Sequence, residues 1–186
     1  MMQRSQAAGI IICGLNGSGK SALAAALSQM TGIAHLDIEA YAFEEGDNPY
    51  RAMRSKAEIE ARLMEDIRKS RRFLFSAVRG DLGGELSSLY RLAVVLSAPQ
   101  TVRLQRLRQR SYDRFGARML EGGDLYAQEE AFFRFAAERS PLDAVSWLDE
   151  LSCPVLYLDG RRDCGCLVAQ VLAHLAEVFH LPCGGE

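Results

Sequence analysis

Short apolar runs alternate along the chain with longer stretches in which apolar residues recur every three or four positions. The short runs predict buried strands, and the longer spacing predicts amphipathic helices. Strands are predicted at residues 9–13, 33–36, 72–78, 92–96 and 155–158. Helices are predicted at residues 20–30, 56–69, 99–110, 126–139, 143–151 and 167–180. Because strands and helices alternate, we expect an α/β fold in which helices cover both faces of a parallel sheet.

Two segments interrupt this alternation, residues 41–54 and residues 111–124, and both are rich in polar and turn-forming residues. Irregular insertions of this length in a compact domain are usually lids or binding loops. In open parallel sheets they lie at the carboxyl ends of the strands, where ligands bind. We therefore expect one domain over residues 1–186, with a ligand-binding insertion at about 38–55 and a lid at about 110–125.

The composition is that of an ordinary globular domain, because 48% of the 186 residues are hydrophobic and 25% are charged. No apolar run approaches the roughly 20 residues that a membrane-spanning helix needs. The apolar residues 7–15 are interpreted as the first strand rather than a signal segment, so a cytoplasmic protein is expected. The net charge of −2 gives no overall attraction to nucleic acid or to anionic membranes, and neither is expected as a partner.

Cysteine and histidine form no recognisable site in the sequence. The five cysteines, an odd number, lack the paired spacing of a zinc site or a disulfide framework, and the three histidines are dispersed. The close pair Cys164 and Cys166 is interpreted as the start of a helix. Neither a structural metal nor a disulfide scaffold is therefore predicted.

A glycine-rich loop carries the strongest chemical signal. Residues 14–21 read Gly-Leu-Asn-Gly-Ser-Gly-Lys-Ser and fit G-x-x-x-x-G-K-[ST], the Walker A phosphate-binding pattern, between a predicted strand and a predicted helix. Backbone N–H groups of such a loop and the following helix N-terminus favour a polyphosphate. The alternative is a Gly/Ser loop that only joins a strand to a helix. The predicted nucleotide-binding residues of the loop are Gly14, Asn16, Gly17, Ser18, Gly19, Lys20 and Ser21.

An acidic pair follows the second predicted strand and complements the loop. Lys20 is expected to reach the β- and γ-phosphates, and the Ser21 hydroxyl to bind Mg²⁺, so ATP and Mg²⁺ are the expected cofactors. Asp37 is predicted to join the Mg²⁺ shell and to act as base for an acceptor hydroxyl, while Glu39 faces the acceptor. The alternative for each acid is a solvated loop residue or a helix N-cap.

Arginines supply the positive charge that phosphoryl transfer requires. Arg103, Arg106 and Arg110 recur on one helix face, and two more arginines follow in the glycine-containing segment. The guanidinium fork matches phosphate oxygens, although many arginines on such a face are simply solvated. The predicted catalytic cations of the lid are Arg110, Arg114 and Arg118.

A further arginine ends the third predicted strand. Arg79 follows a buried apolar run, which is a poor place for a surface charge and a good one for a clamp on an acceptor phosphate or carboxylate. It is predicted to serve both catalysis and acceptor binding. Arg51 and Arg54, which open a helix beside the first insertion, are weaker candidates for the same acceptor.

These motifs together resemble the nucleoside-monophosphate-kinase-like branch of P-loop proteins, in the layout of adenylate kinase and shikimate kinase. The chain is also similar to small bacterial proteins labelled AAA-family ATPases. The resemblance is carried by residues 14–21, by the acidic pair, by Arg79-Gly80-Asp81, by a lid at 110–126 and by Leu158-Asp159-Gly160. It implies a sheet in the order 2-3-1-4-5, three layers and ATP-dependent transfer to a small acceptor.

The same resemblance assigns the last strand. Residues 155–159, four apolar residues and an acid, loosely match a Walker B motif, but this strand is the sheet edge in the implied topology. The turn that follows it is expected to pack beside the adenine, with Gly160 as a nucleotide contact. Asp37-x-Glu39 differs from the Asp-x-Asp of shikimate kinases, and the Gly-Gly-Gly run of those enzymes is absent.

Three function classes fit these features to different degrees. The first is an ATP-dependent phosphotransferase with a small-molecule or nucleotide acceptor and a closing lid. The second is a nucleotide-binding ATPase or switch that acts on a protein partner without a small acceptor. The third, a nucleic-acid end kinase or repair ATPase, ranks last because the chain lacks a basic patch with interleaved aromatic residues.

Overall fold

The structure, a computed structural model, describes residues 7–43 and 53–179. Its centre is a five-stranded sheet in the order β2-β3-β1-β4-β5 with every neighbouring pair parallel, which confirms the predicted fold class and strand order. Each strand overlaps one predicted apolar run. The strands are β1 (Ala8–Cys13), β2 (Ala34–Asp37), β3 (Arg72–Ala77), β4 (Tyr90–Ser97) and β5 (Val155–Asp159).

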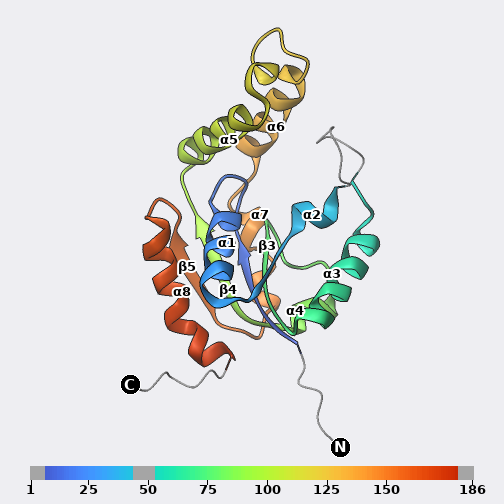
Figure 1. Ribbon diagram of the computed structural model, residues 1–186, viewed down its shortest axis with the longest axis vertical. Helices are drawn as coiled ribbons and strands as arrows, with labels where there is room; N and C mark the ends of the chain where they lie inside the picture. The colour runs from blue at the N-terminus through green and yellow to red at the C-terminus, as the bar shows by residue number, and fades with distance from the viewer. Residues whose placement is uncertain (1–6, 44–52, 180–186) are drawn as a thin grey trace, which may run out of the picture.

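Helices surround the sheet and extend beyond its carboxyl edge (Figure 1). Two of the segments are short 3₁₀ turns. The helical segments are α1 (Lys20–Thr31), α2 (Ile38–Ala42), α3 (Lys56–Ser70), α4 (Gly84–Ser88), α5 (Gln100–Phe115), η1 (Gly116–Met119), α6 (Tyr126–Glu138), α7 (Leu142–Val145), η2 (Leu148–Glu150) and α8 (Cys164–Phe179).

Successive residues of the central strand β1 face opposite sides of the sheet, and this separates two apolar cores. Ile10 and Ile12 pack with residues of α1 and α8 on one face. Ile11 and Cys13 pack with residues of α3 and with Trp147 on the other. All four β1 side chains are fully buried, as expected for a parallel strand covered on both faces.

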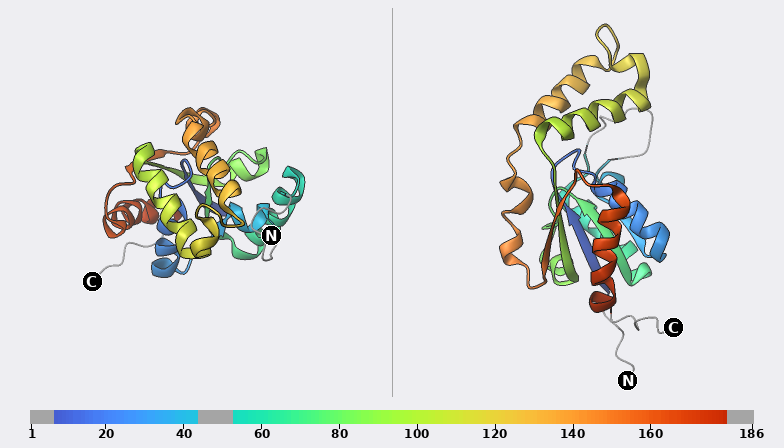
Figure 2. Two further views of the ribbon diagram at one scale, coloured as in Figure 1. Left: turned by 90° about the horizontal axis from the view of Figure 1, so that it is seen from above. Right: turned by 90° about the vertical axis from the view of Figure 1, so that its left-hand side faces the viewer.

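A third apolar cluster lies outside the sheet layers. The α5–α6 hairpin, residues 100–138, consists of α5, η1, α6 and their connection, and it rises above the carboxyl ends of the strands (Figure 2). Its cluster contains Leu107, Met119, Phe133 and Ala136. Because these side chains bury one another, the hairpin has a core of its own.

The α5–α6 hairpin is more helical than the sequence predicted. The expected end of the helix at residue 110 was wrong, because α5 continues to Phe115. Its buried positions Arg103, Leu107 and Ser111 are spaced by four, and the helix ends where Gly116 adopts a positive φ of 56°. The irregular part of the predicted lid is therefore limited to the residues after the 3₁₀ turn η1.

Other boundaries also differ from the prediction. The predicted helix over residues 143–151 is two short pieces, α7 and η2, and α8 begins at Cys164 rather than at residue 167. The short helices α2 and α4 were not predicted, since five residues are too few for a periodic pattern. Residue 180, the predicted end of the last helix, and residues 44–52 of the first insertion lie outside the described residues.

The described part of the chain contains no helix that is both long enough and apolar enough to cross a membrane.

Candidate active site

The loop between β1 and α1 has a backbone that only glycine adopts easily. Gly14, Gly17 and Gly19 have φ values of 147°, 81° and 105°. A Cβ on Gly14 would collide with the carbonyl oxygen of Leu96, and one on Gly17 would lie 2.5 Å from the carbonyl oxygen of Arg103. Conformation and close approach both require glycine here, which is how a phosphate-binding loop keeps its N–H groups accessible.

Lys20 opens α1 and lies back across this loop. Its Nζ donates to the carbonyl oxygen of Leu15 at 3.1 Å. Burial lowers the pKa of Lys20 from its ordinary value to about 8, while Glu39 and Asp37 oppose the shift and Arg110 adds to it. The charged amine is thus partly desolvated, and a polyphosphate placed beside it would favour the charged form and raise its pKa again.

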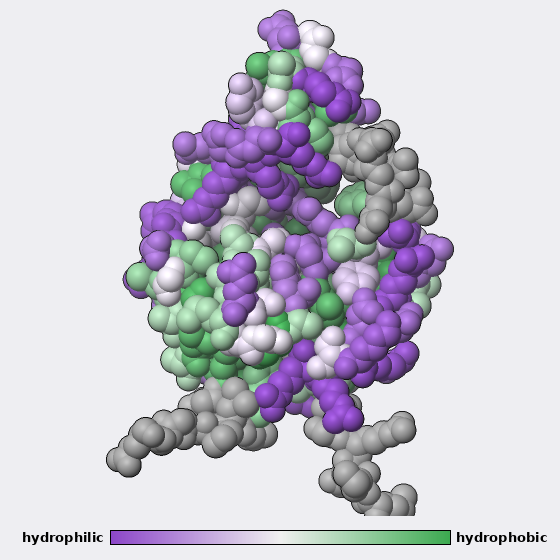
Figure 3. Space-filling view, viewed as in Figure 1, coloured by the Kyte–Doolittle hydropathy of each residue, from purple (hydrophilic) through white to green (hydrophobic). Residues whose placement is uncertain are grey.

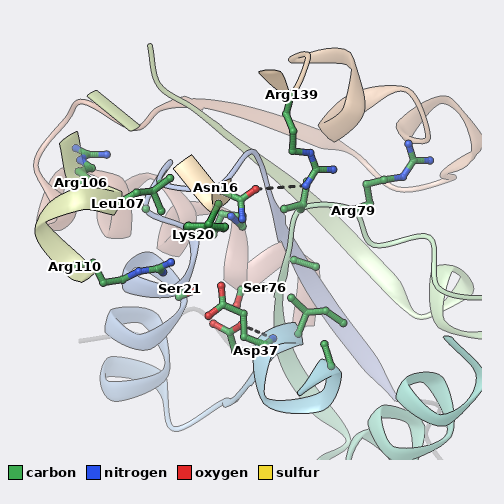
Figure 4. Close-up of a pocket in the computed structure, with 18 of the residues that line it drawn as sticks. Asn16, Lys20, Ser21, Asp37, Ser76, Arg79, Arg106, Leu107, Arg110 and Arg139 are labelled. Carbon is green, nitrogen blue, oxygen red and sulfur yellow. Dashed lines mark hydrogen bonds between the residues drawn. The ribbon is translucent and has the colours of Figure 1, made fainter. Parts of the chain in front are cut away.

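The cleft beside the loop has a volume of ≈ 660 Å³ and gathers groups from distant parts of the chain. Figure 4 shows loop, acidic and arginine side chains around the same space. A band of hydrophilic residues along α5 borders the hollow from above in Figure 3. The charged and polar residues that line it are Asn16, Lys20, Ser21, Asp37, Glu39, Ser76, Arg79, Arg106, Arg110 and Arg139.

The acidic pair is where the sequence predicted, at the end of β2. Asp37 lines the cleft and also caps α2, because its Oδ1 accepts the backbone N–H of Glu39 at 3.0 Å. Asp37 is thus a helix N-cap, the alternative considered from the sequence, and also lines the cleft. The His35 ring supports this end of the strand, since its Nε2 lies 2.9 Å from Ser76 Oγ and 3.9 Å from Asp37 Oδ2.

These residues fit a Mg²⁺ ion that is held together with a nucleotide. Mg²⁺ usually keeps several waters and takes one or two carboxylates plus substrate phosphates. Ser21 and Asp37 line one cleft, with Glu39 beside them, and offer one hydroxyl and two carboxylates. Among the described residues no group of three or more metal-ligating side chains could hold an ion without a nucleotide.

Two predicted loop contacts do not face the cleft. Gly14 and Ser18 are buried and do not line it, whereas Asn16, Gly17, Gly19, Lys20 and Ser21 do. The backbone N–H of Ser18 donates to Leu15 O at 3.1 Å. The Ser18 hydroxyl lies beneath the loop, buried and with no hydrogen-bond partner. Gly14 and Ser18 therefore shape the loop rather than contact the cleft.

Of the three arginines predicted for the lid, the structure brings one to the cleft. Arg110 lines it, close enough to affect the pKa of Lys20. Arg114 instead lies over the ring of Phe115, 5.0 Å from its centroid. Arg118 makes a two-pronged pair with Asp124, at 2.6 and 3.0 Å. Arg114 and Arg118 lie outside the cleft in this structure.

Three other arginines hold the loop and were not chosen from the sequence. Arg106 donates to Ser18 O at 3.3 Å and to Gly160 O at 2.9 Å. Buried Arg103 donates to Asn16 O at 3.0 Å. Arg139, which follows α6, donates to Asn16 Oδ1 at 3.4 Å. The spacing of Arg103 and Arg106 was visible in the sequence, but nothing local marked Arg139.

The predicted acceptor arginines are less available than expected. Arg79 lines the cleft, yet its Nε and Nη2 donate to the carboxylate of Asp81 at 2.9 and 2.6 Å. Its Nη1 donates to Ser146 Oγ at 3.1 Å. Arg54 donates to the carbonyl oxygens of Tyr41 and Phe43, outside the cleft. Arg51 lies outside the described residues.

The turn after β5 packs against the loop, and Gly160, predicted as a nucleotide contact, does not itself line the cleft. A Cβ there would lie 2.6 Å from Ser18 O, so turn and loop are in direct contact. Asp159, the acid of the loose Walker B match, is bound by Arg161 at 2.7 Å and does not line the cleft.

Comparisons with known proteins agree with this geometry. A family model described as AAA domain matches residues 10–125. The Bacillus subtilis protein YqaC, described as uncharacterized, is 31% identical over 175 residues, which span 90% of this chain and 97% of YqaC.

Two solved structures with a similar fold are described as kinases. A gluconokinase from Sinorhizobium meliloti superposes with a TM-score of 0.55 at 16% identity, covering 96% of this chain and 97% of that one. A sugar kinase from Janibacter superposes with a TM-score of 0.50 at 17% identity, covering 92% and 95%. At such identities the likeness concerns the fold.

Proposed function

The chain belongs to the family of AAA domains, and from the geometry of its cleft we propose that it is an ATP-dependent phosphotransferase. It moves the γ-phosphoryl group of ATP onto a small acceptor. The observation that carries this proposal is the cleft itself, in which the phosphate-binding loop, the Asp37–Glu39 pair and several arginines converge beside space for a second ligand. The kinase fold of the solved neighbours supports the same reaction class.

The loop binds the polyphosphate of ATP in this proposal. Backbone N–H groups of Asn16, Gly17 and Gly19 and the N-terminus of α1 bind the phosphates, and Lys20 leaves Leu15 O for the β- and γ-oxygens. A Mg²⁺ ion bound by Ser21 and Asp37 would neutralise charge on the phosphates. The turn at Gly160 and the Arg106 guanidinium border the nucleoside side of the loop.

Asp37 is the proposed base for the acceptor. The acceptor oxygen forms a bond to the γ-phosphorus, while the bond from that phosphorus to its bridging oxygen breaks and its electron pair leaves with ADP. The acceptor proton passes to the Asp37 carboxylate. Charge that develops on the transferred group meets Lys20 and Arg110, which line the same cleft.

The α5–α6 hairpin is the proposed lid. Arg110 points into the cleft from α5, and Arg139 approaches it where the chain returns from α6. Closure of the hairpin would exclude water and prevent hydrolysis of ATP. Arg114 and Arg118 are proposed to shape the lid through Phe115 and Asp124 rather than to touch phosphate.

A comparison of ATP consumption with and without acceptors tests the proposal. ADP release is followed over a panel of hydroxylated and phosphorylated metabolites, with mass spectrometry of the products. We expect one class of acceptor to raise turnover by about 100-fold or more over water. The proposal fails if ATP turnover never exceeds the water background, and the switch that acts on a protein partner is then favoured.

Asp37→Asn adds a residue-level control to this assay. The variant should lower transfer by about 100-fold while ATP still binds, because the base is lost and the loop remains. Asp149→Asn removes an exposed carboxylate far along the chain, in η2, and should leave transfer unchanged. Equal losses in both variants would contradict the role of Asp37.

A further inference from the structure

The side of the cleft formed by α2, the residues after β3 and α6 carries a set of apolar side chains, with Glu39 and Arg79 next to them in the sequence. The apolar side chains that line the cleft on this side are Ile38, Ala42, Phe43, Met53, Val78, Phe132 and Phe135.

Three of these side chains are unusually exposed for their size. Phe43, Met53 and Phe135 are 37%, 68% and 54% exposed, and they come from three separate places in the chain. Single exposed apolar residues are ordinary on a protein surface. Their convergence on one concave site is typical of a pocket that waits for an apolar ligand.

A guanidinium lies at the edge of this apolar surface. Arg139 stacks over the ring of Phe135, 5.4 Å from its centroid. Its polar contacts are long, 3.4 Å to Asn16 Oδ1 and 3.7 Å to Asp143. Arg79, by contrast, is held by Asp81 at 2.6 Å. Arg139 is therefore the better placed of the two to exchange its present contacts for a ligand anion.

Neutral hydrogen-bonding side chains are scarce in the cleft. Among the described residues that line it, they are Asn16, Ser21 and Ser76. The Ser76 hydroxyl already lies 2.9 Å from His35, Asn16 contacts Arg139, and Ser21 belongs to the metal side. Hydroxyl groups placed against the apolar side chains Phe43, Met53 and Phe135 would lose water without gaining equivalent partners, whereas the charged side chains of the cleft remain available to the anionic and reacting groups of a ligand.

On the basis of the proposed function, we propose that the acceptor is an anionic alcohol with an aromatic or similarly flat apolar body, and not a polyol. Its body packs between Phe43, Met53 and Phe135, and its anionic group pairs with Arg139. Its hydroxyl group then lies toward Asp37, on the phosphate side of the cleft. This specificity differs from that expected of a kinase that acts on sugars or sugar acids.

A matched pair of small alcohols tests this acceptor class. 3-Phenyllactate and gluconate each carry one carboxylate with a hydroxyl on the neighbouring carbon, but the first has an aromatic body and the second has four further hydroxyl groups. Their binding is measured by calorimetry on the full chain with Mg²⁺ and the β,γ-imido analogue of ATP. We expect phenyllactate to bind about tenfold more tightly than gluconate. Equal affinity, or tighter binding of gluconate, would overturn the proposal.

Variants of the apolar surface localise the preference. Phe135→Ser and Met53→Ser should each weaken phenyllactate binding by about fivefold or more and leave gluconate and nucleotide binding within about twofold. Leu120→Ser is the matched control, because Leu120 is a 47% exposed apolar residue of the same hairpin that does not line the cleft. A preference that survives the first two substitutions, or is lost with Leu120→Ser, would also overturn the proposal.

The two proposals fail separately in these experiments. If phenyllactate binds selectively through Phe135 but no acceptor in the panel is phosphorylated, the proposed apolar site is supported and the proposed kinase activity is contradicted. If gluconate or another polyol is phosphorylated efficiently, the proposed kinase activity is supported and the proposed acceptor class is contradicted.

Discussion

At the scale of single residues, Lys20 shows how burial prepares a group for a ligand. Its amine donates to Leu15 O in the folded chain, and desolvation holds its pKa at about 8. The unfolded chain would titrate near 10.5, so the folded state binds fewer protons between these pH values. Folding is therefore opposed by the charged amine below pH 8, and stability from this group rises between pH 8 and 10.5.

The same shift predicts a proton linkage for nucleotide binding. Phosphate oxygens beside Lys20 favour its charged form and raise its pKa, so ATP binding at pH 8.5 should take up roughly 0.5–0.8 proton. The measurement is the binding enthalpy in buffers of different ionisation enthalpy, and the affinity should fall as the pH rises above 8. Lys20→Met should remove the uptake; an unchanged uptake in that variant would assign the proton to another group.

Arg79 carries a second prediction at this scale. Its hydrogen bonds to Asp81 and Ser146 connect the residues after β3 with the residue that follows α7, on the proposed acceptor side of the cleft. Arg79→Ala should raise the acceptor KM by about tenfold and change ATP affinity by less than about twofold. Lys20→Ala is the comparison, and an equal loss of ATP affinity in both variants would defeat the acceptor-side assignment.

Local sequence predicted the loop and the acidic pair but not every cation. Gly17, Lys20 and Asp37 are recognisable because their roles depend on a few neighbouring residues after a buried strand. Arg139 reaches Asn16 across 123 positions, which no local pattern encodes. Arg114 and Arg118 carry the right charge in a predicted lid, yet Phe115 and Asp124 hold them there.

At the scale of elements, α5 connects the phosphate loop with the rest of the hairpin. Arg103, Arg106 and Arg110 lie along one side and contact successively the loop backbone, the turn at Gly160 and the cleft. Their spacing was visible in the sequence, but two of the arginines predicted for the lid, Arg114 and Arg118, lie outside the cleft. The central strands β1, β3 and β4 were recognisable because nearly all of their residues are buried, whereas α2 is too short to show a helical period.

Arg106 is the arginine of α5 whose removal should affect nucleotide binding most selectively. It joins Ser18 O and Gly160 O, so Arg106→Ala loosens the contact between the loop and the turn after β5. We expect ATP to bind about tenfold more weakly. Arg108→Ala is the matched control on the same helix, because Arg108 pairs with Glu130 away from the cleft. Similar losses in the two variants, measured by calorimetry, would contradict this assignment.

At the scale of the whole molecule, three apolar clusters divide the chain into a sheet with two covered faces and a hairpin with a separate core. Phe75 belongs to a sheet core and Phe133 to the hairpin core, and both are buried. Removing a buried phenyl group typically destabilises a protein by about 3–5 kcal/mol. Whether the substitution destabilises the sheet or the hairpin depends on the cluster to which the ring belongs.

Two substitutions distinguish these compartments. Phe75→Ala should lower the midpoint of global thermal unfolding, whereas Phe133→Ala should mainly lower transfer and increase hydrogen exchange in α5 and α6. Circular dichroism and exchange measured by mass spectrometry report the two effects. Equal decreases in the unfolding midpoint would show that hairpin and sheet unfold as one cooperative unit.

The separate core of the hairpin also affects how proteins of this family could diversify. Because the hairpin has its own apolar core, it can be exchanged as a unit, provided that its two junctions with the rest of the chain, near Pro99 and Arg139, are kept. Grafting the corresponding segment of a relative onto this sheet would then change the apolar lining of the cleft, and the loop would keep its contacts only if the graft carried arginines at positions 103 and 106.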